Sequence, residues 1–194
     1  MEQRGNILFT GVGGQGILLA SELTAYAQLA AGFDVKKSEV HGMAQRGGSV
    51  EAHLRYGKKV YSPLIELGSA DILVAFEILE AVRYLPFLHR NSTVVVNTQK
   101  ILPPAVALGK AKYPENILDE LKARQIKVVA IDAFAVAQSV GELRTVNVAM
   151  VGAMSNFLAV GSEVFLTVID NTVKPNFREV NKKAFAAGRA AASA

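Results

Sequence analysis

Short apolar runs alternate along the chain with longer stretches in which apolar residues recur every three or four positions. The runs with the length and composition of buried strands are residues 6–10, 33–40, 71–76, 92–97 and 127–131. The stretches with helical spacing are residues 17–31, 77–88, 133–140, 145–158 and 176–192. Because strands that alternate with helices build parallel sheets covered on both faces, this pattern predicts an α/β fold with a largely parallel sheet.

Residues 50–62 follow a different pattern, which predicts an antiparallel hairpin. Polar and apolar residues alternate over residues 51–55, Gly57 lies in a turn with two lysines, and an extended run resumes at Val60. This hairpin makes the predicted sheet mixed. We therefore expect a three-layer α/β/α, Rossmann-like domain that spans residues 1–194.

Three of the predicted helices suggest burial or a partner surface. Helix 17–31, which Gly32 can cap, is apolar on nearly every side. Helix 145–158 is rich in small apolar residues and is expected to be capped near Asn147, and helix 176–192 is rich in alanine. Their apolar surfaces belong either to the core or to contacts with other chains.

Composition excludes several classes of function. The 21 basic and 17 acidic residues give a net charge of +4, and the basic residues are scattered, so nucleic-acid binding is not predicted. The chain has no cysteine and therefore holds no disulfide, thiolate zinc site or iron–sulfur cluster of its own. Neither a signal peptide nor a membrane span is predicted, and we expect a cytoplasmic protein without a membrane partner.

A G-x-G-x-x-G motif lies between the first predicted strand and the first predicted helix. Its candidate cofactor-binding residues are Gly11, Gly13, Gly14, Gln15 and Gly16. Backbone N–H groups at the start of a helix favour a phosphate or a carboxylate. The same glycines also suit a turn with a purely structural role.

The glycine motif leaves open a freestanding NAD-dependent dehydrogenase. Such a protein needs an acidic residue about twenty positions later to bind ribose, and Glu39 follows Gly16 by 23 residues. Against it, Lys36 and Lys37 occupy the presumed second strand, and a polar glycine segment follows. A nonenzymatic nucleotide-binding module is a further alternative.

Residues 38–49 combine an acid, an imidazole, an amide, a guanidinium and three glycines in one short segment. Its candidate cofactor-binding residues are Glu39, His41, Gln45, Arg46, Gly47 and Gly48. Such a segment has little apolar surface to bury, and the fixed fork of donors on Arg46 suits a phosphate or a carboxylate. Alternatively, Glu39 and Arg46 pair with each other across the loop.

Neither a metal site nor a catalytic residue is predicted. His41, His53 and His89 do not have the spacing of metal ligands, and no H-E-x-x-H sequence occurs. No G-x-S-x-G or other nucleophile motif is present. The sequence therefore gives little support to a freestanding hydrolase.

Taken together, these segments resemble the gamma subunit, or gamma domain, of the 2-oxoacid:ferredoxin (acceptor) oxidoreductases, most of all the small subunit of the indolepyruvate branch. The two glycine-containing motifs, residues 11–16 and 38–49, carry the resemblance. Supporting matches are residues 70–73, Glu77, Glu80, Arg83, Asn97, Asn147, residues 152–153 and residues 181–188. The resemblance spans essentially the whole chain.

The resemblance implies a subunit of a larger enzyme that converts a 2-oxoacid to an acyl-coenzyme A and passes electrons to ferredoxin. In this family, thiamine diphosphate, magnesium and the iron–sulfur clusters belong to partner subunits. The gamma domain packs on those subunits and helps to position coenzyme A, so the two glycine motifs would contact that co-substrate. The isolated chain is expected to be inactive and to self-associate when it is made alone.

Overall fold

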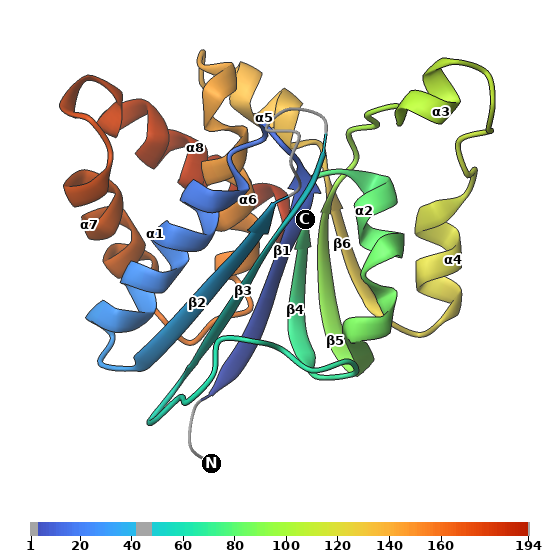
Figure 1. The fold of residues 1–194 in the computed structure, drawn as a ribbon. Coiled ribbons are helices and arrows are strands. Elements are labelled where there is room, and N and C mark those ends of the chain that lie inside the picture. Colours follow the sequence, from blue (N-terminus) through green and yellow to red (C-terminus); the bar gives the residue numbers. More distant parts are fainter. Residues whose placement is uncertain (1–3, 42–47, 194) are drawn as a thin grey trace.

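The computed structural model describes residues 4–41 and 48–193, which form one six-stranded mixed sheet (Figure 1). The strand order is β2-β3-β1-β4-β5-β6. The strands are β1 (Gly5–Val12), β2 (Asp34–His41), β3 (Ser49–Gly57), β4 (Ala70–Ala75), β5 (Leu88–Asn97) and β6 (Lys127–Ile131). β3 runs antiparallel to both of its neighbours, whereas β1, β4, β5 and β6 pair in parallel. The predicted mixed α/β sheet is thus confirmed.

The hairpin lies elsewhere than predicted. β3 pairs antiparallel with β2, so that Asp34 faces Gly57 and His41 faces Val50, and residues 58–69 form no strand. The prediction of a hairpin over residues 50–62 is therefore wrong. Both edges of β3 are already paired, with β2 on one side and β1 on the other, which leaves no edge for residues 60–62 to join.

Two helical layers cover the sheet (Figure 1). One layer contains α1 (Ile17–Ala30), α5 (Ala133–Ser139), α6 (Val146–Ser155), α7 (Ser162–Thr172) and α8 (Arg178–Ala191). On the opposite face lie α2 (Ile78–Arg83) and α4 (Ile117–Ala123), whereas α3 (Pro104–Ala107) belongs to the connection between β5 and α4. Alternate residues of β1 enter the two resulting cores: Ile7 and Phe9 enter one, and Leu8 enters the other.

α6 and α8 lie in close backbone contact. A Cβ atom at Gly152 would collide with the carbonyl oxygen of Phe185, and one at Gly188 would collide with that of Ala149. Every residue of α6 from Asn147 to Ser155 is buried within the chain itself. The small apolar residues of α6 up to Ser155 are therefore core, whereas Phe157 and Leu158 are partly exposed.

Several helix boundaries differ from the predicted ones. The predicted helix 77–88 is interrupted by Pro86, which lacks an N–H donor, and continues as a short 3-10 turn, η1 (Leu85–Phe87), that leads into β5. A second 3-10 turn, η2 (Leu143–Thr145), precedes α6, and η3 (Pro175–Phe177) precedes α8. α6 is predicted to be capped near Asn147, but its N-cap residue is Thr145; Asn147 lies in the first turn of α6, and its amide donates to the carbonyl of Gly16 in the glycine loop at 3.4 Å.

Over residues 4–41 and 48–193, no helix has both the length and the apolar character that crossing a membrane requires.

Candidate functional site at the carboxyl edge of the sheet

The carboxyl ends of β1 and β4 lie where the winding of the sheet reverses. From β1 the chain passes through α1 on one face toward β2 and β3, and from β4 it passes through α2 on the other face toward β5. In open α/β sheets, ligands bind in the crevice outside the carboxyl ends of the strands at such a switch point. The predicted glycine loop lies at this position, between β1 and α1.

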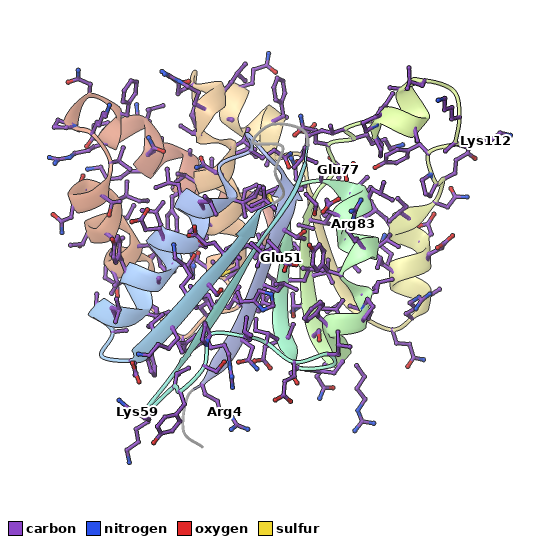
Figure 2. The ribbon with its side chains drawn as sticks, viewed as in Figure 1. Arg4, Glu51, Lys59, Glu77, Arg83 and Lys112 are labelled. Atoms are coloured by element: carbon purple, nitrogen blue, oxygen red, sulfur yellow. The ribbon has the colours of Figure 1, made fainter. Side chains whose placement is uncertain are left out.

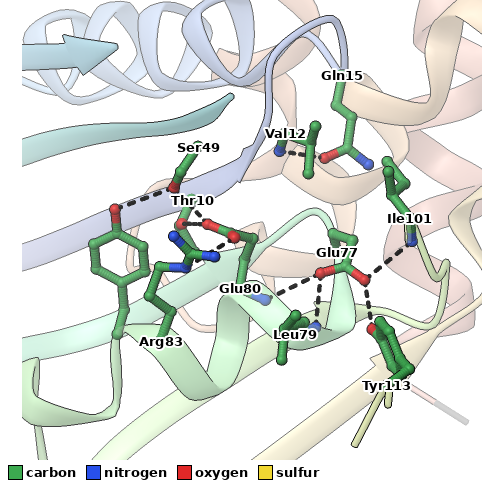
Figure 3. A network of polar contacts seen from close by, with 11 residues as sticks. Thr10, Val12, Gln15, Ser49, Glu77, Leu79, Glu80, Arg83, Ile101 and Tyr113 are labelled. Atoms are coloured by element: carbon green, nitrogen blue, oxygen red, sulfur yellow. Dashed lines mark hydrogen bonds and ion pairs between the residues drawn. The ribbon is translucent and has the colours of Figure 1, made fainter. Parts of the chain in front are cut away.

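Gln15 connects the glycine loop to the residues that follow β4 and β5, and Figure 3 shows its bond to Val12. Its Oε1 accepts a hydrogen bond from the Val12 amide at 2.8 Å, and its Nε2 donates to the carbonyl of Phe76 at 2.9 Å and to Gln99 Oε1 at 3.1 Å. Asn97, which is fully buried, donates to the same Phe76 carbonyl at 3.1 Å. Both polar atoms of the Gln15 amide thus form hydrogen bonds within the protein. Contact of Gln15 with a cofactor stays a prediction.

Three of the loop glycines have a structural reason to be glycine. A Cβ atom at Gly11 would lie 2.8 Å from Gln15 and from Phe76. Gly16 has a φ of +79°, and its Cβ would lie 2.6 Å from the amide nitrogen of Asn147. Gly14 has a φ of +106° with no atom within 4 Å of the Cβ position, so only its backbone conformation demands glycine there.

The N-terminus of α1 leaves backbone donors available. Gly16 precedes the first turn of α1, and no side chain caps this end of the helix. The first N–H groups of a helix have no partner within the helix, and the helix dipole adds a partial positive charge. This end of α1 therefore suits an anionic group, as the sequence predicts.

A cavity of 270 Å³ is lined in part by Asn147, the residue whose amide contacts Gly16 of the glycine loop. Leu19, Val173 and Phe177 give it an apolar wall, and its charged residues are Lys174, Arg144 and Glu142. The Arg144 guanidinium lies 4.8 Å from the centre of the Phe177 ring and pairs with Glu142 at 2.7 Å, and its hydrogen bonds lower the pKa of Glu142 to about 2. The cavity thus combines an apolar wall with the Lys174 cation and an Arg144–Glu142 ion pair.

The two sequence motifs meet at the switch point. The amide of Gly13 donates a hydrogen bond to the carbonyl of Gly48 at 2.8 Å, which joins the glycine loop to the end of the 38–49 segment. Gln45, Arg46 and Gly47 lie outside the described residues, as does the side chain of His41, the last residue of β2. Their predicted roles therefore stay predictions.

The position of Glu39 argues against dinucleotide binding. Glu39 lies in the edge strand β2, and β3 separates β2 from β1. With a strand spacing of about 4.8 Å, β2 lies about 10 Å from β1, whereas the ribose-binding acid of a dinucleotide site lies on the strand adjacent to β1. Glu39 bonds Lys37 Nζ at 2.6 Å instead. The strand order thus removes the acid on which the dehydrogenase alternative depended.

Two buried carboxylates, Glu77 and Glu80, also lie at this edge (Figure 3); the sequence indicates them only as matches of the resemblance and assigns them no role. Glu77 caps α2 by accepting from the amides of Leu79 and Glu80, and it also accepts from the Ile101 amide at 3.1 Å and the Tyr113 hydroxyl at 2.6 Å. Burial and the bond to Glu77 raise the pKa of Tyr113. The sequence signal that could have indicated these residues is an acid at the N-cap followed by a second acid three residues later, directly after a buried strand.

Glu80 is the second buried carboxylate, and it contacts the 38–49 segment. Its Oε2 accepts from Ser49 Oγ at 2.6 Å and from Thr10 Oγ1 at 3.3 Å, and its Oε1 pairs with Arg83 Nε at 3.1 Å. The Tyr84 hydroxyl lies 3.5 Å from Ser49 Oγ, and burial raises the pKa of this tyrosine to about 12. In the described part of the chain, no three His, Asp or Glu side chains are grouped as metal ligands.

Comparison with known proteins places the chain in a family. The profile of the family described as pyruvate ferredoxin/flavodoxin oxidoreductase matches residues 6–191. The indolepyruvate oxidoreductase subunit IorB of Archaeoglobus fulgidus is 43% identical over 94% of this chain and 92% of its own length. IorB of Thermococcus kodakarensis is 41% identical over 96% of this chain and 95% of its own length.

Solved structures confirm the fold. The gamma subunit of a keto/oxoacid ferredoxin oxidoreductase from Geobacter sulfurreducens has a TM-score of 0.73 at 23% identity and covers 97% of this chain and 98% of its own. A 2-oxoglutarate:ferredoxin oxidoreductase from Magnetococcus marinus, with 2-oxoglutarate, coenzyme A and succinyl-CoA bound, has a TM-score of 0.78 at 19% identity. This chain is covered completely and matches 32% of that longer chain. The chain therefore belongs to the pyruvate ferredoxin/flavodoxin oxidoreductase family, as a small, gamma-type subunit.

Proposed function

We propose that this gamma-type subunit helps to position coenzyme A in a 2-oxoacid:ferredoxin oxidoreductase whose thiamine diphosphate, magnesium and iron–sulfur clusters are held by partner subunits. The observation that carries the proposal is the hydrogen bond between Gly13 and Gly48, because it brings the two motifs of the sequence together at the switch point of the sheet. That is the position where α/β proteins of this topology bind their ligands.

The chemistry of the edge suits coenzyme A. This co-substrate carries several phosphates and a long, mostly uncharged arm that ends in a thiol. The uncapped N-terminus of α1 offers N–H donors to a phosphate, and the neighbouring cavity offers an apolar wall with the cation of Lys174. We assign to this chain binding and orientation of the co-substrate, and we leave the bond-making steps to the partner subunits.

Indolepyruvate is the 2-oxoacid that we would test first. The relative from Archaeoglobus fulgidus, which is 43% identical, is named as a subunit of an indolepyruvate oxidoreductase. Because the 2-oxoacid would bind mainly to the partner subunits, no residue of this chain is assigned to its recognition. A cytoplasmic location and electron transfer to ferredoxin through the partners belong to the same proposal.

The test is reconstitution of the complex from this chain and its partner subunits. We expect thiamine-dependent reduction of an electron acceptor that requires a 2-oxoacid and coenzyme A, with a panel of 2-oxoacids identifying the substrate. The isolated chain should show neither this activity nor nicotinamide binding. Activity of the isolated chain, or a complex whose rate does not depend on coenzyme A, would contradict the proposal.

Arg46→Ala tests the 38–49 segment within that complex. Loss of a charge-assisted hydrogen bond costs roughly 1.5–3 kcal/mol, which corresponds to a fall of about 10- to 150-fold in coenzyme A-dependent turnover or affinity. The matched control is Arg90→Ala, because Arg90 is exposed at the start of β5 on the opposite edge of the sheet. If Arg46→Ala lowers the melting temperature and leaves the rate unchanged, Arg46 has a structural role only.

A further inference from the structure

We infer that Glu80 is a positioning residue of this enzyme: it fixes Ser49 and, through Ser49, the contact of Gly48 with the glycine loop. The inference rests on the proposed function, because it concerns the geometry of the same edge. Glu80 is 3% exposed, and its Oε2 accepts the hydroxyl hydrogen of Ser49 at 2.6 Å (Figure 3). This hydrogen bond joins α2 to the 38–49 segment.

One short hydrogen bond anchors Ser49. Its single hydroxyl hydrogen is used by Glu80, and the Tyr84 hydroxyl lies 3.5 Å from Ser49 Oγ. Burial raises the pKa of Tyr84 to about 12, and a hydrogen bond from this phenol to Glu51 adds to the rise. The bond to Glu80 in α2 is therefore the contact that holds the Ser49 side chain.

Fixing Ser49 also fixes the peptide bond that precedes it. Ser49 lies opposite Val12 at the last pair of the β1–β3 ladder, where no further pair supports the chain. The next residue back is Gly48, whose carbonyl oxygen receives the Gly13 amide at 2.8 Å. Glycine can adopt many backbone conformations, so Gly48 does not fix the orientation of its own carbonyl. We infer that the anchored Ser49 side chain fixes this orientation.

The local fold does not require a carboxylate at position 80. Glu77 already caps α2, and the strand ladder holds β3 next to β1 without any side chain. Burying a carboxylate costs free energy unless it is paired, and Arg83, with a side chain 53% exposed, supplies the pair from the surface. A costly group that reaches one of the two sequence motifs is better explained by positioning than by stability.

Tyr113 provides a control outside the two motifs. Its hydroxyl donates to Glu77 at 2.6 Å, and the residue lies in the connection between β5 and α4. Glu77 itself is unsuitable as a control, because it accepts a hydrogen bond from the Glu80 amide at 3.1 Å. Substitution of Tyr113 should therefore reveal the cost of losing a partly buried hydrogen bond without displacing Ser49.

The experiment measures steady-state kinetics and melting temperature of the reconstituted complex with Ser49→Ala, Glu80→Gln and the double variant. We expect each single variant to raise the KM for coenzyme A about 10- to 150-fold and to leave the KM for the 2-oxoacid unchanged, as expected for loss of one charged hydrogen bond. The KM of the double variant should be no higher than that of the more impaired single variant, because both changes break the same hydrogen bond. Ser49→Thr, which keeps the hydroxyl, should restore the wild-type KM.

The control variant separates positioning from stability. Tyr113→Phe should lower the melting temperature and leave the KM for coenzyme A unchanged. An unchanged KM in Ser49→Ala and Glu80→Gln, or effects that add in the double variant, would overturn the inference. If Glu80→Gln fails to assemble, Ser49→Ala and its rescue by Ser49→Thr decide the matter alone. A wild-type complex without coenzyme A dependence would instead refute the proposed function.

Discussion

The two edges of the sheet use polar residues in opposite ways. At the carboxyl edge, Glu77, Glu80 and Asn97 are buried and connect segments that are far apart in the sequence. At the amino edge, where Figure 2 shows Arg4 and Lys59, the charged groups reach solvent and form exposed ion pairs. Lys36 and Lys59 both pair with Asp34 there, and His89 pairs with Asp71.

This difference predicts where substitutions will matter. A buried acceptor leaves its donors unsatisfied when it is removed, and each such donor costs free energy. An exposed ion pair is screened by salt, and water replaces the lost partner. The carboxyl edge should therefore be sensitive to single substitutions, and the amino edge should tolerate them.

The largest effect is expected for Glu77→Ala. This change leaves the Ile101 amide, the Tyr113 hydroxyl and two amides of α2 without their acceptor, and we expect a loss of about 3–5 kcal/mol in the free energy of unfolding. Asp71→Ala at the amino edge, where the side chain is 49% exposed, should shift the urea midpoint far less. Equal shifts in the two variants would show that the two edges do not differ.

The glycines at the two ends of α1 allow a matched comparison. Gly16 at the carboxyl edge and Gly32 at the amino edge both have a positive φ, of +79° and +88°. Placing alanine in that conformation costs about 1–2 kcal/mol in the free energy of unfolding at either site. At Gly16 its Cβ also collides with Asn147, so we expect a total of about 2–4 kcal/mol there.

Thermal or urea unfolding of Gly16→Ala and Gly32→Ala measures the difference. The Cβ position of Gly32 has no atom within 4 Å, so the Gly32 variant reports the backbone term alone. If the two variants lose the same stability, Asn147 moves aside without cost. The glycine loop would then be less tightly packed than the contacts indicate.

Local pattern accounts for what the sequence predicted correctly. The buried runs at Val94–Val96 and in β1, and the strand–glycine–helix order around Gly11, are features of neighbouring residues, and each one appears in the structure. The pairing of β3 with β2 depends on which edges are free, which no local pattern encodes. The predicted hairpin was wrong for that reason.

The contacts of the candidate site were also beyond local reasoning. Ser49 and Glu80 are 31 residues apart, and Gln15 and Gln99 are 84 residues apart, so only the fold brings them together. Helix α7 went unpredicted, and β-branched residues such as Val164, Val168 and Ile169 reduce its intrinsic helix propensity. Packing of Phe165 against Phe185 compensates in the folded chain.

The pH dependence of stability is expected to reflect His53, which lies in β3 between the two edges. His53 in β3 is buried, its Nδ1 accepts from the Ile65 amide, and burial lowers its pKa below 6.5 although Glu51 partly opposes this. The unfolded chain therefore binds a proton more readily than the folded chain. Stability from this residue is fully present above pH 6.5 and is lost as the pH falls through the lower folded pKa.

His53→Gln removes that titration and keeps a polar side chain. We expect the decline in the unfolding midpoint just below pH 6.5 to become shallower in this variant. The pKa values of Asp34 and Glu142 are lowered to about 2, so these carboxylates affect stability only at more acidic pH. The pH range in which they act therefore does not overlap with that of His53. An unchanged pH profile in the variant would assign the decline to another group.

The smallest effect is expected for Lys36→Ala and Lys59→Ala at the amino edge. Their side chains are 44% and 64% exposed, and Asp34 keeps its hydrogen bond from the Val60 amide when either lysine is removed. Because the pairs are screened, we expect little change in the urea midpoint at low salt and none at high salt. A shift as large as that of Gly32→Ala that persists at high salt would mean that Asp34 depends on its lysines. The amino edge would then be a connected network like the carboxyl edge, and the contrast between them would lie in burial alone.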